Sequence, residues 1–340
     1  MENIFKNKNI LVTGGTGSIG SVVVNELIKK KCKVIRILSN DENGLYNFSL
    51  NLSNSNKLNF FQSMKSNKIR FIYGDVTDQK RMISICENID YIIHAAALKH
   101  VPICEYNPYE ATKVNVVGTE NLIQAALKNN VSKFILISTD KVVDPTTCLG
   151  ATKLLAERIT LNSNLVKGNK KTIFSVVRFG NIIGSRGSVL PQFISQIKNN
   201  KNLTVTHKMT SRYFVTIKEA VNCIITTLDK MKGGEIFIPK NVRSIRIYEL
   251  ANTIIEFFKK SKIHIKITGL RPSEKLHEKI ISDHEKENIK ELNNVYILDS
   301  QKKHQIKNNN KKKDYFSSEN LKFLSRKDLL KYLQNNKLLD

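Results

Sequence analysis

The chain contains 340 residues, of which 41% are hydrophobic, and carries a formal net charge of +25. This length and apolar content predict one large domain or two closely joined domains, and they exclude a chain that is mostly disordered. The charge alone would suit a nucleic-acid-binding protein, but the lysines are spread among asparagines rather than gathered with aromatic residues, so we expect no nucleic-acid partner.

The sequence also argues against a membrane, secreted or metal-binding protein. Its apolar runs are broken well short of the roughly 20 residues that span a bilayer, and Glu2, Lys6 and Lys8 leave no room for the apolar segment of a signal peptide. The five cysteines are scattered and form no CxxC pair, which predicts reduced thiols and neither disulfides nor a metal site. We therefore expect a cytoplasmic protein without membrane insertion.

Short β-branched runs alternate with helical stretches in the first half of the chain. Strands are predicted in NILVTGG, KVIRIL, RFIYGDV, YIIHAAA and KFILIST, with helices at 18–31 and 109–129 and, over 44–69, a helix followed by a polar connection. Because such alternation is typical of βαβ units, it predicts an α/β fold, a Rossmann-type doubly wound parallel sheet with helices on both faces.

The second half of the chain has a less regular alternation of predicted strands and helices. It shows one more buried strand (IFSVVRFG), a helix at 190–199, a strand at 203–206 and a helix at 217–231; EIFIPK to KIIS suggests a few strands and two helices. We predict a dinucleotide-binding domain (1–170), then a smaller C-terminal substrate-binding lobe (171–300) interleaved with one or two further core strands. A basic loop at 301–313 and a helix from Arg326 to Leu333 make up the last part, 301–340. Such a lobe usually closes over a ligand at the carboxyl ends of the strands.

A glycine-rich turn, TGGTGSIG, follows the first predicted strand and opens the first helix. Glycines in this pattern allow a tight turn and close packing of helix on strand, and they let the backbone approach a pyrophosphate that rests on the helix N-terminus. The turn therefore predicts a dinucleotide cofactor, held by Gly14, Thr16, Gly17, Ser18, Ile19 and Gly20.

The ends of three more predicted strands should line the same cofactor-binding crevice. Asp75 and Val76 follow the third strand, where the carboxylate could accept a hydrogen bond from adenine or could cap the next helix. Ala95 and Ala96 follow the fourth strand, where small side chains let the cofactor lie flat. Asn40 follows the second strand, where an arginine would indicate NADP and a carboxylate NAD, so this position does not choose between them.

Several motifs occur in one order from Ile10 to about Ile281: TGGTGSIG, GDVTD, HAAALKHVPICEYNPYEATKVNVVGTENLI, STDK, GATK, RFGNIIGSRGSVLPQF, THKMTSRYF, GEIFIPK and TGLRPSEKLHE. Together they resemble the nucleotide-sugar 4,6-dehydratases of the polysaccharide-biosynthesis and flagellin-glycan group, in the extended short-chain dehydrogenase/reductase superfamily. The resemblance implies a UDP-N-acetylglucosamine 4,6-dehydratase with a UDP-N-acetylhexosamine substrate, a bound NADP that is recycled (NAD is not excluded), and usually a homo-oligomer.

Removing water across C5 and C6 of a hexose becomes feasible once oxidation at C4 acidifies the C5 proton, and it then needs a base and an acid. Matched to the family motif, Asp140 is the acid toward the C6 oxygen, Lys141 is the base at C5, and Thr139 polarises the C4 oxygen. A lysine that acts as a base needs a pKa lowered by burial or by neighbouring cations.

Lys153 matches the lysine of the superfamily's YxxxK motif and should bond the nicotinamide ribose. The matching tyrosine position holds Leu149, which cannot take the C4 hydroxyl proton, so the C4 base remains open among Asp140, Lys141 and an ordered water. By the same resemblance, Ser273 replaces a usual glycine, and the residues that should face the substrate are Lys99, His100, Asn181, Arg186, Arg212, Arg271 and Glu274.

Two other functions compete with the dehydratase. A sugar-nucleotide epimerase of the same fold would use the C4 ketone only to reverse stereochemistry, and it would not need the acid of the Asp140–Lys141 pair. A non-catalytic dinucleotide-binding regulator would account for Leu149, but it would have no use for an intact STDK motif or for arginines facing a diphosphate.

Overall fold

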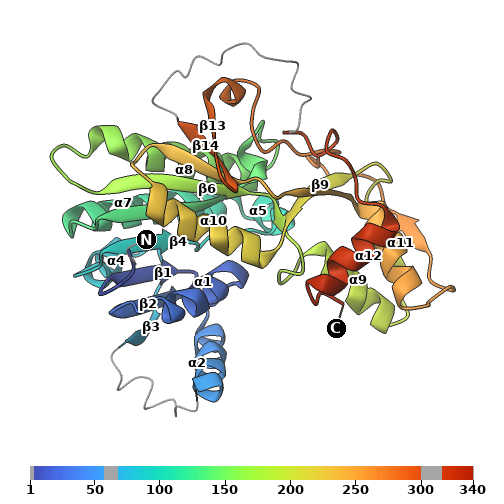
Figure 1. Cartoon of the computed structure of the whole chain (residues 1–340), viewed down its shortest axis with the longest axis horizontal. Coiled ribbons are helices and arrows are strands. Elements are labelled where there is room, and N and C mark those ends of the chain that lie inside the picture. The colour runs from blue at the N-terminus through green and yellow to red at the C-terminus, as the bar shows by residue number, and fades with distance from the viewer. Residues whose placement is uncertain (1–3, 57–67, 300–315, 340) are drawn as a thin grey trace.

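The computed structural model describes residues 4–56, 68–299 and 316–339. Its main element is a nine-stranded sheet with the strand order β13-β14-β10-β6-β5-β4-β1-β2-β3 (Figure 1). Neighbours from β3 to β10 pair in parallel, whereas β14 and β13 add an antiparallel edge. The strands are β1 (Asn9–Thr13), β2 (Val34–Ser39), β3 (Ile69–Tyr73), β4 (Tyr91–His94), β5 (Lys133–Thr139), β6 (Ile173–Phe179), β10 (Glu235–Pro239), β13 (Ile289–Leu292) and β14 (Val295–Asp299).

Helices cover both faces of this sheet and bury a separate apolar cluster on each. On one face, α1 (Ser18–Lys29) and α10 (Ile217–Lys230) pack over the strands, with Leu45 of α2 (Glu42–Asn56) joining the same cluster. On the other face lie α4 (Gln79–Ile85), α7 (Gly118–Lys128) and α8 (Cys148–Val166). The predicted doubly wound α/β architecture is confirmed.

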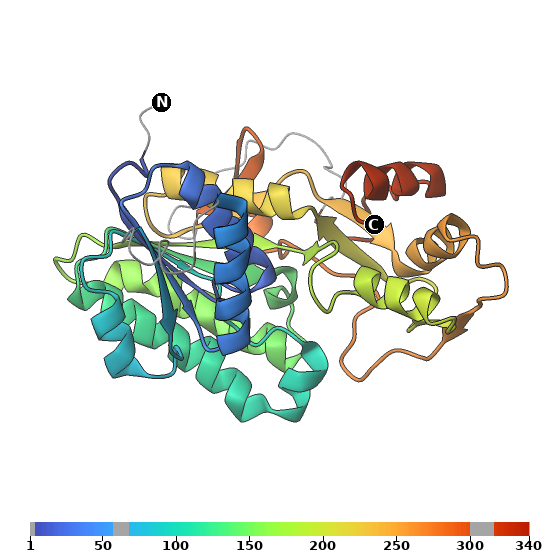
Figure 2. The same cartoon turned by 90° about the horizontal axis from the view of Figure 1, so that it is seen from below.

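A smaller lobe lies to one side of the sheet and has its own core (Figure 2). It contains a sheet of β7 (Asn181–Ile182), β9 (Ser211–Val215) and β11 (Arg243–Arg246), and the pair β8 (Leu203–Val205) and β12 (Ile265–Ile267). Its helices are α9 (Val189–Lys198), α11 (Ile247–Phe257) and α12 (Arg326–Asn335).

Side-chain caps begin several of the described helices, and α8, α10 and α12 are three examples. The Thr147 side chain accepts from the Gly150 amide at the start of α8, and Ser325 accepts from Asp328 at the start of α12. At α10, Thr216 and Glu219 cap each other's backbone amides. Each cap satisfies amides that a helix leaves without a partner, which fixes where these helices begin.

The helix predicted at 109–129 is present as a continuous helical run over 108–128: α6 (Pro108–Thr112), a π-helical turn (Lys113–Val117) and α7 follow one another without a break, after a short α5 (Val101–Tyr106). Pro108 lies in the first turn of this run, where proline is favoured. The structure corrects two other expectations. Between 235 and 282 the structure has one helix, α11, rather than two, since Gly269 and Pro272 break the later segment. β9, β13 and β14 were not predicted, and the loop at 301–313 lies outside the described residues.

Candidate active site

The glycine turn between β1 and α1 is shaped to receive a diphosphate. Gly14 has φ +61°, and a Cβ there would lie 2.8 Å from the Ala96 Cα; a Cβ on Gly20 would collide with the carbonyl oxygen of Gly14. Gly17 forms the N-cap of α1 without a side-chain hydrogen bond, so the first amides of the helix remain available to an anion. These features fit a dinucleotide cofactor.

A single crevice runs along the carboxyl ends of β1 to β6 and continues to the segment after β7. It brings together most of the predicted site residues: Gly14, Thr16, Gly17, Ser18, Ile19, Gly20, Asn40, Asp75, Val76, Ala95, Ala96, Lys99, His100, Thr139, Lys141, Lys153, Asn181 and Arg186. Sequence reasoning did not assign several of its lining residues, among them Ser185, Gly187 and Ser188.

At the end of the crevice formed by β2 and β3, the two predicted polar residues bind each other. The Asn40 side chain donates to Asp75 Oδ2 at 2.8 Å, and Asp75 Oδ1 accepts from both the backbone and the hydroxyl of Thr77. Burial would raise the pKa of Asp75, but these hydrogen bonds outweigh it and hold the pKa below its ordinary value. The helix-capping role belongs to Asp78, which accepts from the Arg81 amide.

Thr139, Asp140 and Lys141 lie at the end of β5, where the strand passes into a 3-10 turn (Asp140–Val142). Asp140 is fully buried, and its Oδ1 accepts from Thr139 Oγ1 at 2.9 Å and from Lys141 Nζ at 3.0 Å. Thr139 and Lys141 line the crevice and Asp140 does not, so hydrogen bonds from these two neighbours connect the Asp140 carboxylate to the crevice.

The charge state of Lys141 differs from the expectation. Burial alone would lower its pKa, but the carboxylates of Asp140 and Glu278 outweigh burial and raise the pKa above its ordinary value. Lys141 is therefore held as an ammonium, which is the opposite of the lowered pKa that a base requires.

Lys153 and Leu149 lie one helical turn apart on α8, and both line the crevice. The Lys153 ammonium is buried and donates to the carbonyl oxygen of Ile137 at 2.6 Å, and burial lowers its pKa to about 8. Leu149 is buried as well and offers no hydroxyl. Leu149 therefore cannot accept a proton from a hydroxyl group in the crevice, and the acceptor stays open among Asp140, Lys141 and an ordered water.

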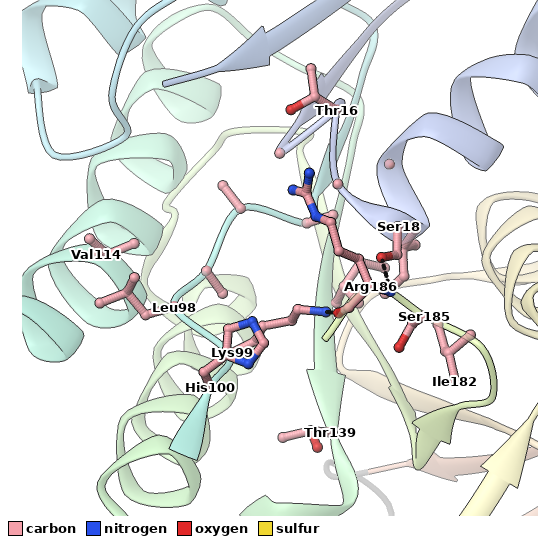
Figure 3. A pocket seen from close by; sticks show the side chains of 18 of the residues that line it. Thr16, Ser18, Leu98, Lys99, His100, Val114, Thr139, Ile182, Ser185 and Arg186 are labelled. Carbon is pink, nitrogen blue, oxygen red and sulfur yellow. Dashed lines mark hydrogen bonds between the residues drawn. The ribbon is translucent and has the colours of Figure 1, made fainter. Parts of the chain in front are cut away.

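The segment after β7 crosses the crevice and is tethered on both sides (Figure 3). The Arg186 amide donates to Ser18 Oγ at 3.2 Å, and Lys99 Nζ donates to the Arg186 carbonyl oxygen at 2.9 Å. The exposed Arg186 guanidinium lies 3.9 Å from an Asp41 carboxylate oxygen. Its positive charge is thus next to the glycine turn, where a diphosphate would be expected.

Arg212, Arg271 and Glu274 do not line this crevice. Arg212 is mostly buried; it forms an ion pair with Glu274 at 3.0 Å and donates to the carbonyl oxygens of Ser211 and Leu276. Ser273 has φ +64°, so it adopts the left-handed conformation that glycine would adopt without strain. The local backbone shape is therefore compatible with the glycine of the family pattern.

One buried acid that sequence reasoning missed lies behind the crevice. Glu278 Oε1 is 3.9 Å from Lys141 Nζ and 3.9 Å from Arg212 Nε, so this carboxylate connects the smaller lobe with the end of β5. Its position within the KLHE segment of a recognised motif was the only available signal.

Within the described ranges, no group of three or more His, Cys, Asp or Glu side chains could hold a metal ion, and no helix is long and apolar enough to cross a membrane.

The family model described as polysaccharide biosynthesis protein matches residues 10–300. The chain belongs to this family. A protein of Methanocaldococcus jannaschii named as an uncharacterized membrane protein is 44% identical to this family member, over 98% of the chain and 97% of the relative. The UDP-N-acetylglucosamine 4,6-dehydratase (inverting) of Campylobacter jejuni is 39% identical over 87% of the chain and 84% of the relative.

The UDP-glucose 4-epimerase of Rickettsia bellii is 37% identical over the same shares of the two chains, 87% and 84%. Among solved structures, Pen from Bacillus thuringiensis has a TM-score of 0.90 and 37% identity, and the match covers 99% of this chain and all of that one. These comparisons confirm the resemblance to the nucleotide-sugar dehydratases of the extended short-chain dehydrogenase/reductase superfamily, and they include epimerases as well as dehydratases.

Proposed function

We propose that this protein is a UDP-N-acetylglucosamine 4,6-dehydratase that uses NADP or NAD. The observation that carries the proposal is the arrangement at the end of β5, where Thr139 and Lys141 line the crevice and share the buried carboxylate of Asp140. An acid–base pair held beside a dinucleotide site suits an elimination across C5 and C6. The similarity to the Campylobacter jejuni dehydratase supports the same conclusion.

In this proposal the glycine turn and Arg186 hold the diphosphates, Asn40 and Asp75 hold the adenosine end, and Lys153 holds the nicotinamide ribose. When it is bound, the nicotinamide supplies hydride acceptance at C4 and hydride return at C6. The proposed substrate contacts in the crevice are Lys99, His100 and Asn181, and those on the smaller lobe are Arg212, Arg271 and Glu274.

The protein's own groups then move the protons. Because Leu149 has no hydroxyl, Asp140 takes the C4 hydroxyl proton through Thr139 and later returns it through Thr139 to the departing C6 oxygen. Lys141, once it is neutral, removes the C5 proton and forms the ammonium. The C5–H bond and the C6–O bond thus break in the same site, and the C6 oxygen leaves as water. After hydride return to C6, the Lys141 ammonium gives a proton to C5, which completes the 4-keto-6-deoxy product.

An epimerase is the second candidate, favoured by the similarity to the UDP-glucose 4-epimerase of Rickettsia bellii. Incubation with UDP-N-acetylglucosamine in deuterated water, followed by NMR, separates the two functions. We expect a 4-keto-6-deoxy product with deuterium at C5; a C4 epimer alone would favour the epimerase, and unchanged substrate would contradict both.

Exchanging each member of the pair tests the proposed roles. Asp140→Asn and Lys141→Ala should each lower turnover by at least about 100-fold, since positioned acids and bases contribute roughly 10²–10⁴-fold. Both variants should keep their cofactor, as measured by fluorescence titration with the reduced dinucleotide. Full activity in either variant contradicts the assigned role.

A further inference from the structure

Glu278 is a buried carboxylate with few hydrogen-bonding partners. The residue is 5% exposed, and its Oε2 has no hydrogen-bond partner among the described residues. Its neighbours are cations that lie slightly beyond hydrogen-bond distance: Lys141 Nζ and Arg212 Nε, each 3.9 Å from Oε1, and Lys275 Nζ, 4.0 Å from Oε2. A buried carboxylate left without a direct hydrogen bond is costly, which suggests a function beyond packing.

The other groups around it do not fully neutralise Glu278. Arg212 already forms an ion pair with Glu274 at 3.0 Å, and Asp140 adds a second negative charge next to Lys141. Burial raises the pKa of Glu278, Asp140 raises it further, and Lys141, Arg212 and Lys275 lower it; the net pKa is above the ordinary value. Glu278 is thus a carboxylate that can accept a proton.

Lys141 needs such an acceptor if it is to be a base. The carboxylates of Asp140 and Glu278 hold its pKa above the ordinary value, so its resting form is an ammonium. Asp140 cannot be the acceptor in the proposed reaction, because it receives the C4 hydroxyl proton. Glu278 is the other carboxylate in ion-pair range of Lys141 within the described part of the chain.

We propose that Glu278 is a positioning residue that takes one proton from Lys141 and so converts the ammonium into the amine that attacks the C5 proton. This inference rests on the proposed dehydratase function. One N–H bond of Lys141 breaks, its electron pair stays on Nζ, and an O–H bond forms on Glu278. The amine then takes the C5 proton, and the electron pair of the C5–H bond passes into the C4 enolate. After the Lys141 ammonium has given a proton back to C5, Glu278 returns its proton to Lys141, which restores the resting charges. A shift of about 1 Å would bring the 3.9 Å pair into hydrogen-bond distance.

Glu278→Gln gives opposite results for the two roles that Glu278 could have. If Glu278 only holds Lys141 in its charged form, removing the carboxylate lowers the pKa of Lys141, and turnover at neutral pH stays the same or rises. If Glu278 accepts the proton, turnover and deuterium incorporation at C5 fall by at least about 100-fold. The loss should shrink by about tenfold per pH unit as bulk base deprotonates Lys141 instead.

The matched control is Asp283→Asn, the same change at an exposed carboxylate on the same segment, which pairs with Lys279 and Lys286. It should keep wild-type turnover. Cofactor affinity and thermal unfolding report whether the Gln variant is folded, and Glu278→Asp, which keeps the carboxylate, should recover part of the rate. Equal turnover and equal pH profiles in wild type and Glu278→Gln would overturn the inference. A wild-type enzyme that forms no 4-keto-6-deoxy product would instead overturn the proposed function.

Discussion

Lys153 illustrates how a single buried charge links binding with stability. Burial lowers its pKa from the ordinary 10.5 to about 8. Between these two pH values the unfolded chain binds more protons at this residue than the folded chain, so stability rises with pH across that window. Below pH 8 the ammonium is present in both states, and the cost of burying it is fully included in the folding free energy.

Replacing Lys153 with methionine should therefore stabilise the protein while weakening cofactor binding. At pH 7 we expect a gain on the order of 3 kcal/mol, because the pKa falls from 10.5 to about 8 and one pKa unit corresponds to roughly 1.4 kcal/mol. Thermal unfolding at pH 7 and at pH 10.5 measures it, and the gain should nearly vanish at the higher pH. Lys29→Met, at an exposed lysine, should change stability by less than about 0.5 kcal/mol at both pH values. A loss of stability at pH 7 would contradict this account.

Sequence reasoning could find the site residues that are neighbours in the chain. Thr139, Asp140 and Lys141 are consecutive and follow a strand, so their shared position needed no knowledge of the tertiary structure. Glu278 was missed because its approach to Lys141 depends on the path of an irregular segment from the smaller lobe. The pKa of Lys141 was likewise hidden, since it depends on how two carboxylates are arranged around it.

At the scale of elements, the connection between β7 and α9, residues 183–188, crosses the crevice, and we call it the strap. Gly184 and Gly187 both have φ +75°, and a Cβ on Gly187 would lie 2.6 Å from His100 Cε1. Between them, Arg186 is hydrogen-bonded to Ser18 and Lys99. The conformation of this strap thus depends on a glycine that permits both the backbone angle and the close approach to His100.

Gly187→Ala should displace the strap and weaken cofactor binding. Backbone strain at such a position costs about 1–3 kcal/mol, and about 1.4 kcal/mol corresponds to a tenfold change in affinity. We expect the dissociation constant of the dinucleotide to rise about tenfold in calorimetric titrations. Gly168→Ala is the control, since Gly168 has φ +57° but its added Cβ would meet nothing within 4 Å. Equal affinities in the two variants would show that the strap does not hold the cofactor.

Elements could be predicted where the pattern is local and strong. β1 to β6 were found because each is a short apolar run followed by a helix or a turn. β13 and β14 were missed because they form an antiparallel edge hairpin, and β13 is only partly buried, so its apolar pattern is weak. β9 was missed because its partners, β7 and β11, lie about 30 residues before it and after it in the chain.

At the scale of the whole molecule, a buried ion-pair network connects the sheet to the later part of the chain. Arg178 on β6 is fully buried, and it bonds Glu157 of α8 at 2.8 Å and Glu285 of a 3-10 turn at 2.9 Å. It also donates to the carbonyl oxygen of Ile280. The segment that carries Glu278 is thereby fixed close to α8, which carries Lys153, and to the end of β5, where Lys141 lies.

Removing the Arg178 charge should destabilise the fold more than removing an exposed arginine. Arg178→Met leaves two carboxylates without a counter-charge, and breaking one partner of a buried pair costs about 3–5 kcal/mol. Arg326→Met breaks an exposed pair with Glu249 and should cost less than about 1 kcal/mol. Adding Glu157→Gln to Arg178→Met should recover part of the loss, because one unpaired charge is then gone. Urea unfolding of the four proteins measures these differences, and similar midpoints for the two arginine variants would mean that the network does not stabilise the fold. The deficit of Arg178→Met should also shrink as the pH falls toward 4, since protonation neutralises the carboxylates that it leaves unpaired.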